Sequence, residues 1–290
     1  MNTHIRADQY GEDRVRCHYE VKDGVALLTL DDEGMNGYSF KMFQDIDAAI
    51  LKARFDPTVQ VIVITGAGEH FCAGANIKML EVADTDSKYY FCLHANETLL
   101  RLEHTPKLVI AAIQGHCVGG GFEIALACDL RVGRAGGGFV GLPEVGLGVL
   151  PGTGGTQRLS RLLGPAKALE MMISGERLPM TKAQEKGLLS RVLGETEEQE
   201  VRGKMRPVPT LSREDFLQEV LQFAQKYCAP HTASAAVGHI KRAVQTGASL
   251  PLESGLAIER ELQAKLFASQ DASEGMSAFV EKRSAQFSGK

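Results

Sequence analysis

The stretch 114–123, QGHCVGGGFE, decides how this chain folds, because it links the apolar run Leu108–Ile113 to an apolar segment at 122–128. The run LVIAAI is typical of a strand that is buried on both faces. The glycines at 119–121 predict a turn, and 122–128 predicts a helix that leads into a strand at 130–132.

The same order of elements is expected upstream of this stretch. Val25–Leu30 and 59–65 are short apolar segments that predict strands, and Ser39 is placed to cap a helix that Asp56-Pro57 ends. A glycine-containing loop at 66–76 follows the second of these strands. Strands that alternate with helices over residues 25–193 predict an α/β core with parallel pairing.

The second half of the chain changes character. Thr181 and Gln184 form a capping box that predicts the start of a helix, and Gly187 is placed to end it. Residues 195–209 are polar and contain prolines, which predicts an irregular connection. The rest of the chain has helical periodicity, at 211–227, 232–246, 251–268 and 273–286.

These patterns divide the chain into four parts. They are a polar N-terminal extension at 1–20, an α/β core at 21–194, a polar connection at 195–210 and a helical region at 211–290. The helical region is too short and too amphipathic for an independent catalytic domain. We therefore expect it to cover the core or to pack on another subunit.

Composition excludes several classes of protein. Hydrophobic residues make up 44% of the 290 residues and charged residues 23%, which is ordinary globular usage and excludes wholesale disorder. The 32 Lys and Arg against 36 Asp and Glu give a net charge of −4, and no basic stripe occurs, so binding of nucleic acid or of an anionic membrane is not expected. The longest apolar runs are far shorter than the roughly 18 residues of a membrane-spanning helix.

Cysteine usage and the first residues indicate a reducing, cytoplasmic setting. The six cysteines are scattered without a CxxC pair, so we expect free thiols and neither a disulfide framework nor a zinc site. The first 16 residues lack an apolar segment and contain Asp8, Glu12 and Asp13, which argues against a signal or transit peptide. No P-loop, HExxH or GxSxG motif occurs, and Phe71 and Gln157 stand where a dinucleotide fingerprint needs its third glycine.

Two glycine-rich loops are the first candidates for a functional site. One is 71–78, FCAGANIK, and the other is 114–123; each follows a predicted buried strand. Small residues let a backbone N–H group approach a ligand closely, and N–H groups at a helix start are unpaired. Two such loops on neighbouring strands would direct two N–H groups at one oxyanion. The alternative is that the glycines only permit tight turns or close packing.

Two glutamates lie near these loops in the sequence. Glu123 falls in the first turn of the helix that the glycines open, and Glu144 lies in a short loop among apolar residues. An apolar surrounding raises the pKa of a carboxyl group, which suits proton exchange near neutral pH. The alternatives are a carboxylate that only complements the helix dipole at Glu123 and a loop salt bridge at Glu144.

Five segments, in order along the chain, resemble motifs of the enoyl-CoA hydratase/isomerase (crotonase) superfamily. They are 73–78 (AGANIK), 119–123 (GGGFE), 143–144 (PE), 151–159 (PGTGGTQRL) and 274–283 (EGMSAFVEKR). The resemblance covers about residues 20–287. It implies a crotonase-like α/β core of repeated ββα units, with a helical C-terminal region that builds homotrimers, often paired into hexamers.

The resemblance also implies an active site. The N–H groups of Ala75 and Gly120 would form the oxyanion hole for an acyl-CoA thioester, while Glu123 orients or activates a water and Glu144 exchanges the proton at Cα. Contacts to substrate and CoA are implied for Ala73, Asn76, Ile77, Lys78, Phe279 and Lys282. The last two, three apart on one predicted helix face, would lie beside the adenine, often on the neighbouring subunit. Both glutamate positions are filled, which predicts an enoyl-CoA hydratase that uses no metal and no cofactor beyond the coenzyme A of its substrate.

The chain departs from the family pattern in one loop. Where many relatives carry Arg-Pro followed by Asn-Ala-Leu, residues 31–38 read DDEGMNGY, of which only Asn36 matches, and Asn76 replaces the usual Asp. Tyr38 and Phe122 either narrow the acyl pocket or belong to the core, so the acyl group stays open. Two other functions also stay open: double-bond isomerisation, which needs mainly one acid–base group, and acyl-CoA binding without catalysis.

Overall fold

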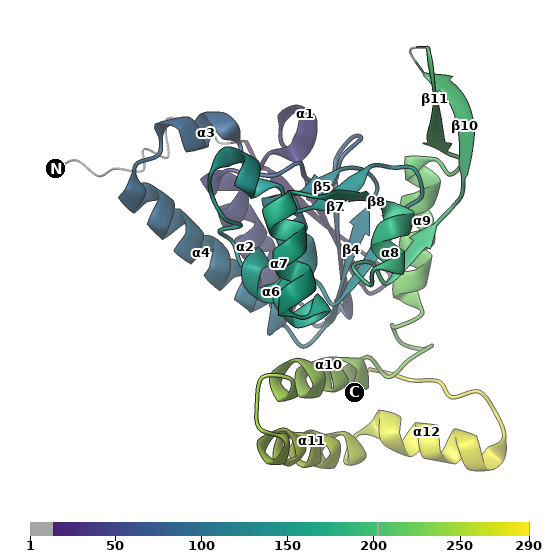
Figure 1. The fold of residues 1–290 in the computed structure, drawn as a ribbon. Coiled ribbons are helices and arrows are strands. Elements are labelled where there is room, and N and C mark those ends of the chain that lie inside the picture. Colours follow the sequence, from purple (N-terminus) through teal and green to yellow (C-terminus); the bar gives the residue numbers. More distant parts are fainter. Residues whose placement is uncertain (1–13, 202, 290) are drawn as a thin grey trace.

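The computed structural model describes residues 14–201 and 203–289, and it gathers the predicted strands into one six-stranded sheet (Figure 1). The strand order is β1-β2-β3-β4-β6-β9, in which β1 and β2 are antiparallel and every other neighbouring pair is parallel. The strands are β1 (Cys17–Lys22), β2 (Val25–Leu30), β3 (Val61–Gly66), β4 (Leu108–Ile113), β6 (Leu130–Arg134) and β9 (Arg191–Leu193). β1 begins inside the segment predicted as a polar extension, of which residues 1–13 lie outside the described part of the chain.

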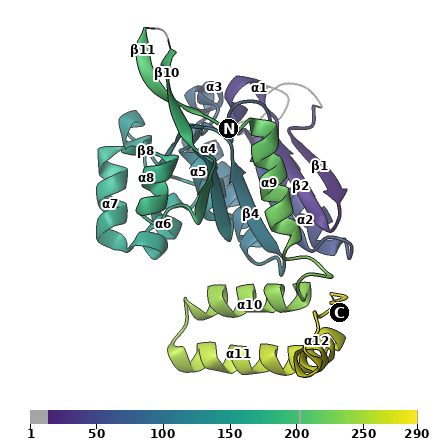
Figure 2. The same ribbon diagram turned by 90° about the vertical axis from the view of Figure 1, so that its right-hand side faces the viewer.

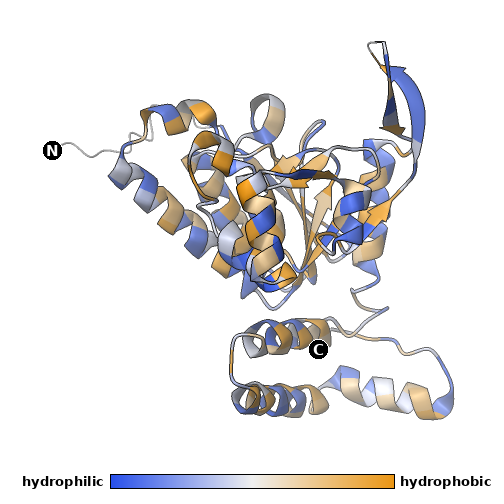
Figure 3. Ribbon diagram, in the orientation of Figure 1, coloured by the Kyte–Doolittle hydropathy of each residue, from blue (hydrophilic) through white to orange (hydrophobic). Residues whose placement is uncertain are grey.

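Both faces of the parallel strands are covered, as the apolar runs predicted. Ile62 of β3 belongs to the larger core cluster, whereas its neighbour Val61 packs on the opposite face with Phe216. Side chains of one strand point alternately to the two faces, so a strand covered on both needs apolar residues throughout. The first face is covered by α2 (Phe40–Phe55), α4 (Thr85–Glu103) and α5 (Gly120–Leu126), the second by α9 (Arg213–Gln225). Figure 2 shows α9 along the sheet, and Figure 3 shows the apolar strands enclosed between these layers.

A second, smaller sheet joins one strand that precedes α5 to two strands that follow it. The strands are β5 (Cys117–Val118), β7 (Phe139–Gly141) and β8 (Arg177–Pro179). Between β7 and β8 the chain forms η2 (Glu144–Leu147), α6 (Gly155–Leu163) and α7 (Pro165–Ser174), and α8 (Met180–Glu185) follows β8. The predicted capping box is wrong: α8 begins directly after β8 with Pro179 as its N-cap, so Thr181 already lies within the helix. Gly187 has a φ of +82°, which confirms it as the residue that turns the chain out of α8.

The predicted irregular connection at 195–209 is also wrong. It forms a hairpin of β10 (Thr196–Val201) and β11 (Lys204–Pro209) that projects from the core (Figure 1). Glu198 faces Pro207 and Gln199 faces Arg206 across the hairpin, and neighbouring residues of a strand point to opposite faces, so polar side chains occupy both of its faces. A strand without a buried face leaves no alternation of apolar residues in the sequence, which is why this pattern was not visible.

The last three helices confirm the predicted helical pattern within a few residues. α10 (Ser234–Gly247), α11 (Leu252–Phe267) and α12 (Gln270–Glu281) form a layer beneath the core in both views (Figures 1 and 2). α10 joins the core through the Lys241 ammonium, which pairs with Asp129 at 2.9 Å and donates to the carbonyl of Lys107. None of the helices in the described ranges has both the length and the apolar character to cross a membrane.

Candidate active site

The two glycine-rich loops lie side by side. Cys72 and Cys117 pair in an isolated parallel bridge, and the Val118 N–H donates to the Cys72 carbonyl at 3.1 Å. Farther along the loops, Gly74 and Gly119 both have positive φ, and a Cβ atom at Gly121 would lie only 2.0 Å from the Cys72 carbonyl oxygen. Glycine therefore lets the two backbones approach each other at the carboxyl ends of β3 and β4. The predicted contact between the loops is confirmed.

Two N–H groups at this contact have no acceptor. The Tyr38 N–H donates to Gly74 O and the Asn76 N–H donates to Tyr38 O, each at 2.9 Å, and this pairing skips the N–H of Ala75. Gly120 is the first residue of α5, where an N–H has no intrahelical acceptor. In the described part of the chain, neither the Ala75 nor the Gly120 N–H donates a hydrogen bond. Both are available to a ligand.

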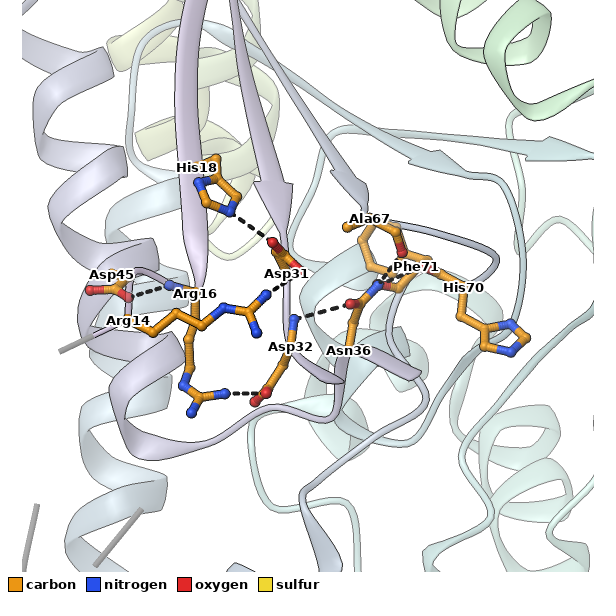
Figure 4. A network of polar contacts seen from close by, with 10 residues as sticks. All are labelled: Arg14, Arg16, His18, Asp31, Asp32, Asn36, Asp45, Ala67, His70 and Phe71. Atoms are coloured by element: carbon orange, nitrogen blue, oxygen red, sulfur yellow. Dashed lines mark hydrogen bonds and ion pairs between the residues drawn. The ribbon is translucent and has the colours of Figure 1, made fainter. Parts of the chain in front are cut away.

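Asn36 holds the first of these loops in place (Figure 4). Its side-chain amide donates to the carbonyls of Ala67, His70 and Phe71 at 2.9, 2.7 and 3.3 Å, and its Oδ1 accepts from the Asp32 N–H at 3.1 Å. Asn36 itself has a φ of +52°, a conformation that asparagine tolerates better than most residues. The one residue of 31–38 that matches the family pattern therefore fixes the loop that leads to Ala75.

Ion pairs anchor the part of 31–38 that departs from the family pattern. Asp31 accepts from His18 Nε2 at 2.9 Å and from Arg14 Nη2 at 3.0 Å, and Arg16 pairs with Asp32 (Figure 4). The hydrogen bond from His18, followed by that from Arg14, lowers the pKa of the Asp31 carboxyl. The sequence differs here, but the segment is tied firmly to β1 and to the loop at 66–71.

Glu123 is buried with its carboxylate surrounded by donors. Its Oε1 accepts the N–H groups of Thr153 and Gly155 at 2.8 and 2.7 Å, and its Oε2 is hydrogen-bonded to the Thr153 hydroxyl. A Cβ atom at Gly155 would lie 3.0 Å from Oε1, so glycine is what lets that N–H reach the carboxylate. Three donors from one turn of the chain fix the orientation of this carboxylate. Glu123 is therefore set up as an acceptor.

Glu144 has the opposite surroundings. It begins η2, its Oε1 lies 3.1 Å from where a Cβ atom at Gly119 would be, and its Oε2 is buried without a hydrogen-bond partner in the described residues. Burial, and then the charge of Glu123, raise the pKa of Glu144 to about 7. A carboxyl group with a pKa near neutrality can both give and take a proton at physiological pH.

Tyr38 packs against the backbone of Gly120. Its ring fills the space that a side chain at Gly120 would need, with Oη 2.6 Å from a Cβ atom built there, and it stacks on Phe91 with the ring centroids 5.6 Å apart. Burial, and then the charge of Glu123, raise the pKa of the Tyr38 hydroxyl, so it remains protonated. Phe122 is fully buried in the main core cluster. Both aromatic residues whose role the sequence left open thus belong to the core, and the Tyr38 ring also lies against Gly120.

The chain is similar to known proteins over most of its length. Residues 20–290 match the family model of enoyl-CoA hydratase/isomerase. The chain belongs to the enoyl-CoA hydratase/isomerase family. The short-chain-enoyl-CoA hydratase of Clostridium acetobutylicum is 32% identical over 266 residues, which cover 91% of this chain and 94% of that protein.

Solved structures of the family have the same fold. The crystal structure of an enoyl-CoA hydratase from Geobacillus kaustophilus HTA426 is 39% identical with a TM-score of 0.86, covering 96% of this chain and 98% of that one. An enoyl-CoA hydratase from Bacillus anthracis is 28% identical with a TM-score of 0.82, covering 95% of this chain and 100% of that one. The predicted superfamily and crotonase fold are confirmed.

The first group of predicted contact residues lies on the segment that leads into α3 (Ile77–Val82). The Ala73 N–H donates to Met35 O at 3.0 Å, and the Asn76 side chain accepts from the N–H of Met79 at 3.4 Å. Ile77 is 58% exposed, whereas the side chain of Lys78 lies outside the described part of the chain. These residues therefore flank Ala75 in the segment that joins the first loop to α3.

The second group lies elsewhere. The prediction that Phe279 and Lys282 share a helix face is wrong, because α12 ends at Glu281 and Lys282 has a φ of +56°. The N–H groups of Lys282 and Arg283 donate to the carbonyls of Phe279 and Ala278, a helix end that takes a left-handed residue even without glycine. α12 lies on the far side of the core from α3, so a single chain does not bring these two residues to the loops (Figures 1 and 2).

Thr153 is the site residue that sequence reasoning missed. It lies in the motif 151–159, yet nothing in the spacing indicates that its hydroxyl meets Glu123, 30 positions earlier in the chain. Within the described ranges, no group of three or more His, Cys, Asp or Glu side chains is placed to hold a metal ion.

Proposed function

We propose that this chain is an enoyl-CoA hydratase that adds water across the Cα=Cβ bond of an acyl-CoA thioester. The proposal rests on one observation: two glutamates with opposite surroundings lie beside two available N–H groups. Glu123 accepts three hydrogen bonds, whereas Glu144 has a buried oxygen that no described residue hydrogen-bonds. Such a pair supplies one acceptor and one group that holds a proton.

In this mechanism the thioester oxygen lies between the N–H groups of Ala75 and Gly120. These donors stabilise the negative charge that develops on that oxygen as the enolate forms. A water molecule gives one proton to the Glu123 carboxylate while its oxygen bonds to Cβ. Glu144 gives its proton to Cα, and the carbonyl re-forms. Donor and acceptor must each hold the correct protonation state, which the raised pKa of Glu144, about 7, makes attainable near neutral pH.

The remaining expectations from the family resemblance belong to the same proposal. Coenzyme A would contact Ala73, Asn76, Ile77 and Lys78 on one subunit and Phe279 and Lys282 on its neighbour. α10–α12 would form the contacts of a homotrimer or of a hexamer built from two trimers; the 85% exposed side chain of Phe279 supports an interface or ligand there. The proposed chemistry needs no metal and no separate cofactor, and a cytoplasmic setting suits the free thiols.

The test is the loss of enoyl-thioester absorbance with a panel of short, branched and dicarboxylic enoyl-CoA substrates in ¹⁸O-labelled water. Hydration places the label in the product, whereas double-bond isomerisation does not. We expect labelled 3-hydroxyacyl-CoA. A folded protein that converts substrates without taking up label would be an isomerase, and one that binds acyl-CoA without turnover would be a non-catalytic binding protein.

A further inference from the structure

A row of three side chains leads away from the proposed oxyanion hole along α4. Tyr38 lies against Gly120, its ring stacks on Phe91 with an angle of 5° between the planes, and the Lys88 ammonium lies 5.1 Å from the centroid of the Phe91 ring. Lys88 and Phe91 are three residues apart on one helix, so both side chains lie on the same face. The row therefore has a phenol at one end and a cation at the other.

The phenol at the inner end is buried and unpaired. Tyr38 is 4% exposed, and in the described residues its hydroxyl makes no hydrogen bond. Phe43 meets its ring edge-on at 5.3 Å and Phe91 stacks on it, so apolar groups hold the ring in one position. The ring is therefore buried and fixed, while its hydroxyl has no protein partner in the described residues and is open to an acceptor on a ligand.

The cation at the outer end also lacks an anionic partner. Lys88 is half-buried, and no carboxylate of a described residue forms an ion pair with its ammonium. The carboxylate of Asp84, one turn earlier, accepts the Ser87 N–H at 2.7 Å instead. Lys88 lies close enough to Glu144 that its charge lowers the pKa of that carboxyl, against the larger effect of burial. The position of the ammonium over the Phe91 ring thus leaves it near enough to the site for its charge to act on Glu144.

A hydrocarbon acyl chain would use neither group. It would cover the Tyr38 hydroxyl without supplying an acceptor and would remove water from the Lys88 ammonium, both of which weaken binding. An acyl chain that ends in a carboxylate would do the reverse, because it pairs with the ammonium and offers acceptor oxygens to the phenol. Hydrogen bonds to charged partners are shorter and stronger than neutral ones.

We infer that this site is built for enoyl-CoA thioesters whose acyl chain ends in a carboxylate, which Lys88 and Tyr38 bind. Lys88 and Tyr38 are then the residues that determine acyl specificity. This inference rests on the proposed hydratase reaction for its kinetic test, but not for its binding test.

The kinetic test compares three substrates that share the reacting bond: crotonyl-CoA, glutaconyl-CoA and the neutral methyl ester of glutaconyl-CoA. We expect kcat/KM to be at least 10-fold higher for glutaconyl-CoA than for its ester. In Lys88→Met the ratio of kcat/KM for glutaconyl-CoA to that for crotonyl-CoA should fall by about 10–100-fold, as expected for the loss of a charge-assisted bond. Lys52→Met is the matched control, because the Lys52 ammonium also lies over an aromatic ring, that of Tyr19, at 4.3 Å. It should leave the ratio unchanged.

Tyr38→Phe keeps the packing against Gly120 and removes only the hydroxyl. We expect it to lower the same ratio by about 3–10-fold, as for a single neutral donor. An equal loss with crotonyl-CoA and glutaconyl-CoA would overturn the role of the phenol in recognising the carboxylate.

Two results would overturn the inference as a whole. The first is a ratio that Lys88→Met leaves unchanged. The second is an equal loss for all CoA substrates that disappears with pantetheine thioesters, since Lys88 would then bind a CoA phosphate.

The binding test keeps the two proposals apart. Titration calorimetry with saturated glutaryl-CoA and butyryl-CoA needs no turnover, and we expect glutaryl-CoA to bind at least 10-fold more tightly, with Lys88→Met removing the difference. Equal affinities would overturn the carboxylate specificity even in an active hydratase. A preference that persists in a protein without hydratase activity would support the specificity and contradict the proposed reaction.

Discussion

The first turn of α5 and the start of η2 place the same residue type in contrasting surroundings. At Glu123, two backbone N–H groups and a hydroxyl surround the carboxylate. At Glu144, burial raises the pKa of the carboxyl to about 7, and one oxygen has no hydrogen-bond partner among the described residues. Environment, not residue type, thus separates a carboxylate that accepts protons from a carboxyl that supplies them. The predictions below test this difference.

The largest expected effect is the loss of either carboxyl group. Glu123→Gln and Glu144→Gln should each lower kcat for hydration by about 10²–10⁴-fold, the usual contribution of a general acid or base. Glutamine at 123 keeps one oxygen for the N–H groups of Thr153 and Gly155, so the variant should fold. Stopped-flow absorbance measures kcat, and calorimetry with a saturated acyl-CoA serves as the control for binding, which should change little.

A near wild-type rate in either variant would contradict the division of labour between the two glutamates. If only Glu144→Gln were inactive, one acid–base group would suffice. That result would favour isomerisation, and the label from ¹⁸O water would then be absent from the product.

The pH dependence is the next largest effect. In the proposed mechanism, hydration begins with one proton shared between the two glutamates, located on Glu144. Dehydration is the reverse reaction and begins with that one proton on Glu123. Both directions therefore require the two glutamates to carry one proton in total. Deprotonation of Glu144 with a pKa of about 7 removes that state. We expect kcat/KM to fall by about tenfold per pH unit above pH 7, equally in both directions, since the overall reaction releases no proton.

Initial rates from pH 5 to 9, with enoyl-CoA in one series and 3-hydroxyacyl-CoA in the other, measure this dependence. A flat profile above pH 7 would show that Glu144 is not the proton donor. Profiles with different alkaline limbs in the two directions would show that the limb belongs to a step other than the chemical one.

A smaller effect is expected from Thr153, which distinguishes the Glu123 surroundings from those of Glu144. Thr153→Val keeps the shape of the side chain and removes the hydroxyl that meets Oε2, so kcat should fall by about 10-fold, as for one hydrogen bond to a charged group. KM should change little, because the hydroxyl acts on Glu123 and not on the bound substrate.

Thr153→Ser restores the hydroxyl and should restore kcat. A loss of kcat in both variants would assign Thr153 to packing alone.

The parts of the fold that could be predicted are those with a strong local signal. Val25–Leu30 and Leu108–Ile113 have the predicted bounds, because strands buried on both faces are apolar along their whole length. α2 begins after Ser39, whose hydroxyl accepts the Met42 N–H at 3.3 Å, and this cap depends on residues three apart. The loops around Ala75 and Gly120 were predictable for the same reason: the signal is contiguous.

The parts that could not be predicted depend on distant residues or on exposed ones. The hairpin at 196–209 has no buried face, so no pattern marks its strands. The bond between Thr153 and Glu123 joins positions 30 apart through the turn before α6, and Tyr38 reaches Gly120 across a still longer separation. Such contacts are set by tertiary packing, which a single sequence does not display.

The smallest predicted effect concerns stability and depends on Glu144 alone. Its pKa in the folded chain, about 7, is above the ordinary value of 4.5, so ionisation favours the unfolded state. The stabilisation linked to the protonated carboxyl is complete below pH 4.5 and is lost as the pH rises through 7. Glutamine cannot ionise, so the Tm of Glu144→Gln minus that of the wild type should increase from pH 5 to pH 8, by about 2 °C. Differential scanning calorimetry at both pH values measures it, with the exposed Glu219→Gln as a control whose difference stays constant. A constant difference for Glu144→Gln as well would mean that this carboxyl is not destabilised by its surroundings, and the contrast with Glu123 would fail.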